Sequence, residues 1–164
     1  MDRLIPTLII VAVIIGLFAL MWWGWTGRQR RQSAIPAPEA PAADLRLSSP
    51  PIAGTYVATT LAAEPLERVA VHHLGVRTTA SLGISGTGIV LDRDGVPDIL
   101  IPAAALEGVR TDSGMIGKFV ERDGLIIVTW RLGDTLVDTG FRPRHSADRT
   151  PTLASIRQLL GEDS

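Results

Sequence analysis

The stretch FVERDGLIIVTWRLGDTLVDTGF, residues 119–141, decides the fold that this sequence predicts. Its β-rich runs are 119–121, 125–132 and 135–141, and turn residues separate them at 122–124 and 133–134. Asp-Gly and similar pairs between apolar runs are strong signals for antiparallel hairpins. The continuous apolar run 125–128 indicates a strand that is buried on both faces. The stretch therefore predicts antiparallel strands joined by tight turns, with Trp130 in the core rather than in a binding groove.

The sequence upstream of this stretch continues the pattern in shorter pieces. The strands that it predicts are 54–61, 69–71, 76–84, 86–91 and 98–101. Residues 93–95, Arg-Asp-Gly, repeat the hairpin chemistry of residues 122–124. A loop is expected at 63–67. A short helical or turn connection is expected at 102–108, because Pro102 cannot continue a central strand.

The last element is predicted to be an amphipathic helix. Thr150 can cap it, Pro151 suits its first position, and Gly161 ends it. Leucine and isoleucine fall on one stripe of this helix, at Leu153, Ile156, Leu159 and Leu160. About seven strands followed by one helix imply a mainly β domain over residues 54–164. We expect an antiparallel β-sandwich or open barrel that the helix caps.

The N-terminal part has a different composition. Residues 4–25, LIPTLIIVAVIIGLFALMWWGW, contain no charged side chain. As a helix of about 1.5 Å per residue they reach roughly 33 Å, against a bilayer core of about 30 Å. A buried helix of a soluble protein would need a polar face, which this segment lacks. The sequence therefore predicts a single transmembrane helix over residues 4–25.

The charges that flank this helix predict its orientation. Arginines follow it at Arg28, Arg30 and Arg31. Tryptophans crowd the same end, at Trp22, Trp23 and Trp25, as is typical of a membrane interface. Under the positive-inside rule, residues 1–3 lie outside and the C-terminal domain lies in the cytoplasm. A cleaved signal peptide is the alternative, but the charged n-region is weak and no cleavage site follows closely.

Residues 26–53 join the predicted helix to the domain. After the basic flank, residues 32–52 hold five prolines among alanine and serine and few large apolar side chains. Such a segment buries too little apolar surface to fold alone, so we expect a semi-stiff tether.

Composition excludes several classes of function. Residues 1–32 carry a net charge of +3, which leaves −4 for the rest of a chain whose formal charge is −1. Nucleic acid is not an expected partner, because phosphate contacts need a basic face. The chain has no cysteine, which removes disulfides, thiolate chemistry and cysteine-bound zinc.

The sequence also resembles a known family. The segments that carry the resemblance are GTYVATT (54–60), ERVAVHHLGVR (67–77), RDGVPDILIPAAALEGVRT (93–111) and GMIGKFVERDGLIIVTWRLGDTLVDTGFR (114–142). They resemble the PH-like domain of small actinobacterial membrane proteins that have one N-terminal span and a Pro/Ala linker. The resemblance implies a pleckstrin-homology-like β-sandwich with a helix, and genes that often lie near those for pyrimidine biosynthesis. It implies no activity.

Residues that could form metal or phosphate sites have simpler explanations. His72 and His73 would point to opposite faces of a strand, and His145 is distant in sequence. Asp92, Asp94 and Asp98 resemble a calcium loop, but Pro97 and Ala103 stand where an EF-hand needs glycine and glutamate. Residues 83–88 are glycine-rich, but no helix follows them to bind a phosphate, so we expect a bend. We expect no metal and no cofactor.

No catalytic constellation is evident either. His145, Ser146 and Asp148 are the residue types of a triad, but neighbours in sequence cannot take its geometry unaided. We therefore expect no enzyme and no small-molecule substrate.

Two functions remain open for such a chain. The first is a non-enzymatic adaptor that holds a protein partner at the cytoplasmic face of the membrane, by strand addition or helix docking. The second is binding of anionic lipid head groups, through the basic flank and through Arg142, Arg144 and Arg149, with Arg157 nearby in sequence. The phosphoinositide site of eukaryotic PH domains is not expected, because the first inter-strand loop offers Glu64 and Glu67 against Arg68.

Overall fold

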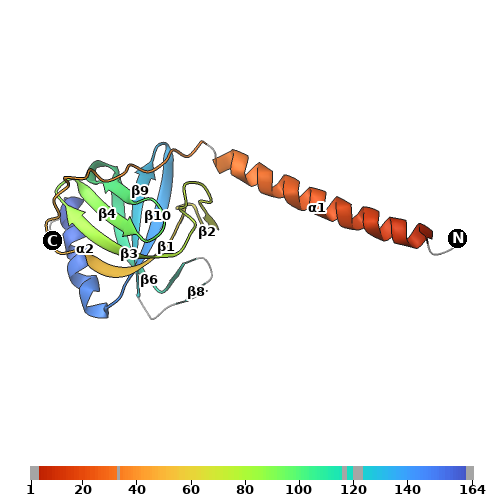
Figure 1. Ribbon diagram of the computed structural model, residues 1–164. Helices are drawn as coiled ribbons and strands as arrows, with labels where there is room; N and C mark the ends of the chain where they lie inside the picture. The colour runs from red at the N-terminus through yellow and green to blue at the C-terminus, as the bar shows by residue number, and fades with distance from the viewer. Residues whose placement is uncertain (1–3, 33, 116–117, 120–123, 162–164) are drawn as a thin grey trace. The chain divides into compact units, whose positions relative to one another are not determined.

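The computed structural model describes residues 4–32, 34–115, 118–119 and 124–161. The chain divides into two compact units, Met1–Ala34 and Ile35–Ser164. The first unit contains helix α1 (Leu4–Gln32), which Figure 1 draws in red and orange. Its stretch Thr7–Gly24 has a mean hydropathy of 2.4, and no part of it is buried. Among the described residues, α1 alone is long and apolar enough to cross a membrane, a property that signal sequences share.

The second unit is a curled antiparallel sheet with a helix at its C-terminal end (Figure 1). Within the described residues, seven strands lie in the order β5-β4-β3-β1-β10-β9-β6, and β2 pairs with β1 beside this path. Their bounds are β1 Ile52–Leu61, β2 Glu64–Arg68, β3 Thr78–Ser85, β4 Gly88–Arg93, β5 Ile99–Pro102, β6 Leu106–Asp112, β9 Leu125–Leu132 and β10 Thr135–Pro143. The predicted mainly β fold, an open barrel with a C-terminal helix, is confirmed.

Two of the predicted hairpins are confirmed. β4 pairs with β5 and β9 pairs with β10, and glycine occupies a left-handed position in each connection. Gly95 has φ 74° and Gly133 has φ 59°, which a residue without Cβ adopts at little cost. The glycine-rich bend is also confirmed, because Ser85 pairs with Gly88 across a tight turn.

The predicted hairpin between residues 119–121 and 125–130 is wrong in its pairing. β9 pairs with β6 and with β10, whereas β8 (Lys118–Phe119) pairs with β7 (Gly114–Met115). Residues 120–123, which include most of the predicted turn, lie outside the described residues. The error arose because LEGVRTD has no strong β pattern. Residues 106–108 were predicted as part of a helical or turn connection, and residues 109–112 were assigned to no element.

Two further segments differ from prediction for a similar reason. Glu64–Arg68 forms β2 although its sequence, EPLER, indicates a loop. It is mostly exposed and gains its order from pairing with β1. Residues 69–71, predicted as a strand, form none, although the Val69 N–H donates to the Thr59 carbonyl at 2.9 Å.

The core occupies both faces of β9, as the run 125–128 predicts. Ile126 and Val128 pack into the main cluster with Trp130, which is 1% exposed. Leu125 and Ile127 pack on the other face in a second, smaller cluster with Met115. The prediction that Trp130 is a core residue is thus confirmed.

Residues 35–51, which we call the strap, lie on the domain and not free of it. Ile35 is 5% exposed in the main core cluster. The strap then follows the β5 edge, where the Leu100 N–H donates to the Glu39 carbonyl at 2.8 Å. Further on, Leu47 forms a bridge with Ser85 beside Gly83. The prediction that this segment is only a semi-stiff tether is therefore wrong. A few apolar side chains and two backbone bridges are enough to order it, because the folded sheet supplies their partners.

The C-terminal helix α2 (Arg149–Leu159) begins one residue before the predicted cap, Thr150. Asp148 is its N-cap residue, and no side chain caps it. The predicted stripe is confirmed, since Leu153 and Ile156 are buried and Leu159 and Leu160 pack against the core. Gly161, with φ 71°, follows its end.

Candidate functional site

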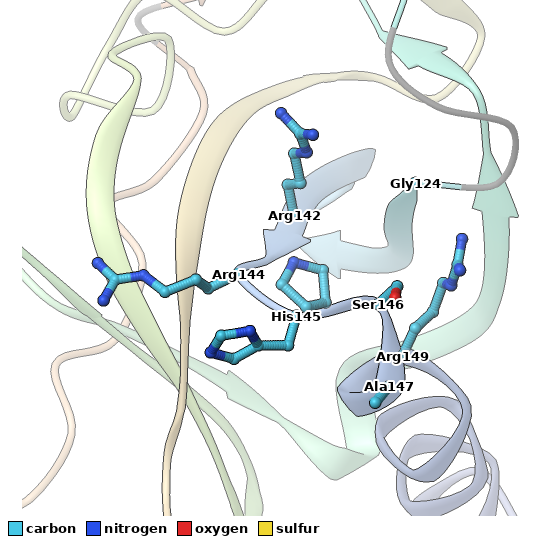
Figure 2. A pocket seen from close by; sticks show the side chains of 8 residues that line it. Gly124, Arg142, Arg144, His145, Ser146, Ala147 and Arg149 are labelled. Carbon is cyan, nitrogen blue, oxygen red and sulfur yellow. The ribbon is translucent and has the colours of Figure 1, made fainter.

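A cavity of about 360 Å³ lies where β10 passes into α2 (Figure 2). A short 3₁₀ helix, η2 (Ser146–Asp148), joins the two elements. The residues that line the cavity are Gly124, Arg142, Pro143, Arg144, His145, Ser146, Ala147 and Arg149. The sequence RPRHSADR thus supplies a basic lining from a single turn of chain.

Pairing with β1 fixes the backbone of this lining. Thr55 lies opposite Arg142 and Gly54 lies opposite Pro143 in the antiparallel register. The Arg144 N–H continues the ladder by donating to the Ala53 carbonyl at 2.8 Å. A Cβ at Gly54 would collide with the Arg142 carbonyl oxygen and the Phe141 ring, so the close approach of the two strands requires glycine there.

The turn into α2 brings the remaining lining residues into place. His145 and Asp148 occupy the N-cap positions of η2 and α2, and neither side chain caps its helix. The Asp148 N–H donates to the His145 carbonyl at 3.2 Å. Thr152, which is buried, holds the first turn of α2 through a hydrogen bond from its hydroxyl to the Asp148 carbonyl.

The lining is positively charged. Arginine stays protonated in proteins, so Arg142, Arg144 and Arg149 contribute three fixed charges. Among the described residues no carboxylate lines the cavity. Arg142 and Arg144 form no ion pair with any described residue. In Figure 2, Arg142 and Arg149 extend the same way from β10 and α2, whereas Arg144 and His145 point to another side.

A second cavity, of about 280 Å³, continues this surface. It shares Arg142, Pro143 and Arg144 with the first cavity and adds Gly54, Thr55 and Thr79. We call Arg142, Arg144, His145 and Arg149, with the two cavities between them, the basic pocket.

The structure brings together three of the basic residues that the sequence singled out. Arg142, Arg144 and Arg149 line the basic pocket, and Arg157, farther along α2, does not. Sequence reasoning weighed His145 only as a metal ligand or triad member and missed its place beside these arginines. The signal was present as four basic side chains within residues 142–149.

The basic pocket and the start of the strap lie at opposite ends of the β9–β10 hairpin. Ile35 accepts a 2.9 Å hydrogen bond at its carbonyl from His72 Nε2, and Pro36 lies beside Gly133 in the hairpin turn. We call this the entry end of the domain. β10 has nine residues, which at about 3.3 Å each separate the turn from the basic pocket by roughly 30 Å.

The titratable groups with shifted pKa values lie elsewhere in the domain. Burial raises the pKa of Tyr56 to about 12, against smaller opposing effects of Thr59 and Arg93. Burial also lowers the pKa of Arg93. A hydrogen bond to Asp138, at 2.7 Å, raises the pKa of Arg110 on the outer face of the sheet. These groups hold strands and loops together and form no acid–base pair across a cavity.

The other candidate residues take structural places in the described part of the chain. His72 and His73 lie in a loop with φ 56° and 58°, not in a strand. Asp98 accepts a 2.9 Å hydrogen bond from the Arg93 N–H within the β4–β5 hairpin. His145 points away from Ser146 in Figure 2. No group of three potential metal ligands occurs among the described residues.

The predicted membrane-interface residues lie in α1. Trp22 and Trp23 are exposed, at 68% and 75%. The side chains of the others lie outside the described residues: Trp25, Arg28, Arg30 and Arg31.

The sequence of the domain matches the model of a known protein family. The sequence model of a family described as Bacterial PH domain-like matches residues 34–157. The match begins at the strap and covers every strand of the sheet, so the strap belongs to the domain by sequence as well as by contact. A comparison with curated proteins finds no match.

Proposed function

Because the chain belongs to the Bacterial PH domain-like family, we propose that it is a non-enzymatic adaptor, anchored in the membrane by α1. PH-like domains are generally non-catalytic and act by binding. The proposal assigns the bilayer to α1 and a protein partner to the domain, at the cytoplasmic face of the membrane.

The observation that carries the proposal is the apolar helix joined to this domain. No part of Thr7–Gly24 is buried by the rest of the chain, so the helix has no role in the core of the protein. In water an exposed apolar surface of this size would favour aggregation, whereas in a bilayer it contacts the hydrocarbon chains of the lipids. A binding domain attached to such a helix raises the local concentration of its partner at the membrane.

Affinity capture from detergent-solubilised membranes tests the adaptor function. The full chain is expected to recover one protein partner reproducibly, because the domain is folded and its surface is available. A matched control chain that ends after residue 33 keeps α1 and lacks the domain, so it should recover none. Equal recovery by both chains, or no reproducible partner, would contradict the proposal.

Binding of anionic lipid head groups is the second candidate. The observation that favours it is the basic character of residues 142–149, since each basic residue near an anionic surface contributes about 1 kcal/mol. The full chain, reconstituted in neutral nanodiscs, is then expected to bind anionic vesicles, and added salt should weaken the binding. Vesicle binding that is absent or insensitive to salt removes this candidate.

A further inference from the structure

We infer that two copies of this chain associate through the outer face of the sheet, where Arg144 of each copy enters an acidic cavity of the other. The outer face is the one that points away from the main core cluster. The inference goes beyond the adaptor function and does not depend on it, because it concerns contact between identical domains. It follows from the register of four strands, the charges at the two sides of this face and a cavity beside one of them.

A row of four residues crosses the outer face, one on each of β4, β3, β1 and β10. Asp92 pairs with Ser81, and Ser81 pairs with Ala53. The Arg144 N–H continues the row by donating to the Ala53 carbonyl at 2.8 Å. Residues that lie opposite one another in paired strands share a face of the sheet. Both neighbours of Ser81 in β3 belong to the main core cluster, so the row faces outward.

The two ends of this row carry opposite charges. Asp92 and Arg144 are exposed, and neither side chain has an ion pair or hydrogen bond with a described residue. Three strand spacings separate them, roughly 14 Å in all. The screening length at physiological salt is about 8 Å, so the attraction within one copy is weak. Each charge is therefore available to another molecule.

A second row lies beside the first and repeats its pattern. Thr55 pairs with Arg142 on one side and with Thr79 on the other. The Asp94 N–H extends this row by donating to the Thr79 carbonyl at 3.0 Å. Aspartates thus lie at the β4 side of the face and arginines at the β10 side. The side chains between them are small, so a second sheet can approach closely.

A cavity of about 220 Å³ lies at the aspartate end of the first row. Its walls come from the strap, β3, β4 and the loop before β5, and they include the carboxyl groups of Asp92 and Asp98. Apolar side chains complete them, among which are Leu45, Leu47 and Val90. No described basic residue lines this cavity. Arginine combines an apolar stem with a planar cation that binds carboxylates, so its side chain suits such a cavity.

The outer face is complementary to itself, which favours a second copy as its occupant. In a two-fold dimer each residue contacts its counterpart's partner, so both contacts form together. With the axis parallel to the strands, the β10 side of one copy faces the β4 side of the other. Arg144 of each copy then lies against Asp92 of the other. An axis along the rows would place like charges together, which is unfavourable.

Sedimentation equilibrium of the full chain in detergent micelles tests the inference, over chain concentrations from about 1 to 100 μM. We expect a reversible equilibrium between monomer and dimer, and added salt should shift it toward the monomer. Arg144→Glu and Asp92→Arg should each weaken dimerisation at least about tenfold, because each places like charges at both symmetric contacts. Both positions are exposed, so neither change disturbs the core.

Mixing the two variants separates a specific contact from a general effect of charge. In a dimer of one Arg144→Glu chain and one Asp92→Arg chain, both contacts again join opposite charges. The mixture is therefore expected to form heterodimers with an affinity within about threefold of wild type, although each variant alone stays monomeric. Distinct fluorescent labels on the two chains measure the heterodimer directly.

Arg157→Glu and Asp134→Arg are the matched controls. They make the same charge changes at exposed positions of α2 and of the β9–β10 turn, outside the two rows. Dimerisation should stay within about twofold of wild type in each, and mixing them should add nothing. A chain that ends after residue 33 reports any association through α1, and we expect it to show no salt-sensitive dimer.

Three results would overturn the inference. The first is a full chain that stays monomeric over this range, and the second is a dimer that the short chain forms equally well. The third is equal weakening by the test and control variants. Loss of a captured protein from the Arg144→Glu chain, without loss of the dimer, would assign this face to a different protein and would also overturn the second copy as its occupant.

Discussion

Tyr56 shows at the residue scale how one buried hydroxyl orders several parts of the sheet. Its hydroxyl donates to the Leu74 carbonyl at 2.7 Å, so the hydroxyl of Thr59 must donate to Tyr56. Thr139 in turn donates to Thr59 at 2.8 Å, and Trp130 Nε1 donates to Thr139 at 2.8 Å. This buried chain has a single consistent direction, which satisfies every member and links β1, β9 and β10 to the loop before β3.

Arg93 is a buried cation in the same region. Its guanidinium forms no ion pair with a described carboxylate, although the charge of Asp98 favours its protonated form. Its guanidinium donates to the carbonyls of Pro97 and His73 and lies 4.7 Å from the centre of the Tyr56 ring. The left-handed backbone of His72 and His73 costs about 1–2 kcal/mol per residue. The bonds to Arg93 and to Ile35 offset this cost, since they use the His73 carbonyl and the His72 ring.

The titration of Tyr56 gives a pH prediction. Its pKa is raised from 10.0 to about 12 in the folded protein, so the unfolded chain loses the phenol proton first. The free energy of unfolding is therefore unaffected by this group below pH 10 and falls between about pH 10 and pH 12, by about 3 kcal/mol at most.

Tyr56 is the only tyrosine, so the near-ultraviolet absorbance of phenolate reports it directly. Ionisation of the folded protein should occur well above pH 10 and coincide with unfolding. Tyr56→Phe should flatten the dependence of stability on pH in this window. An ordinary phenol titration centred at pH 10 in the folded protein would contradict the burial and hydrogen bonding described above.

At the element scale, the strap completes the domain. It pairs with the outer edge of β5 through Glu39 and Leu100, and an uncovered sheet edge is a site of aggregation. Farther on, the Ser48 N–H donates to the Ile84 carbonyl at 2.7 Å. The strap thus joins the sheet at both of its ends, with Ile35 as its apolar anchor in the core.

Truncation of that anchor tests the strap. Ile35→Ala should lower the free energy of unfolding by about 2–4 kcal/mol, because it removes buried methylene groups and leaves a cavity. Thermal unfolding of the full chain in detergent, followed by near-ultraviolet circular dichroism, measures the loss. Leu47→Ala, at a position 38% exposed, is the matched control and should cost less. A free tether would tolerate both changes equally.

At the scale of the whole molecule, a candidate membrane helix is followed by a domain with two distinct ends. The chain enters the domain beside Gly133 and His72, and the basic pocket lies at the far end of the β9–β10 hairpin. The topology of the chain in the membrane decides from which compartment a ligand can reach the domain.

Reporter fusions test that topology. Alkaline phosphatase fused after Ser164 should be inactive, and green fluorescent protein at the same position should fluoresce, because the positive-inside rule predicts that Arg28, Arg30 and Arg31 keep the domain side in the cytoplasm. Replacing these arginines by glutamine and adding lysines before residue 4 should shift the reporters toward the opposite result. Phosphatase activity in the unmodified fusion would place the domain outside and contradict the proposed adaptor at the cytoplasmic face.

The sequence by itself determined the local features of this protein. Apolar runs, Asp-Gly turns and the stripe on α2 predicted the open barrel and its helix, because these signals lie within a few residues of one another. Uninterrupted hydropathy marked α1 in the same way. Only the tertiary structure decided that EPLER and LEGVRTD are strands and that the strap is docked, because these segments gain their order from partners that lie far away in sequence. The basic pocket could be predicted only in part. The sequence shows the arginines within residues 142–149. The pairing of β10 with β1 and the turn into α2 bring three arginines to one cavity, whereas Arg157 lies outside it.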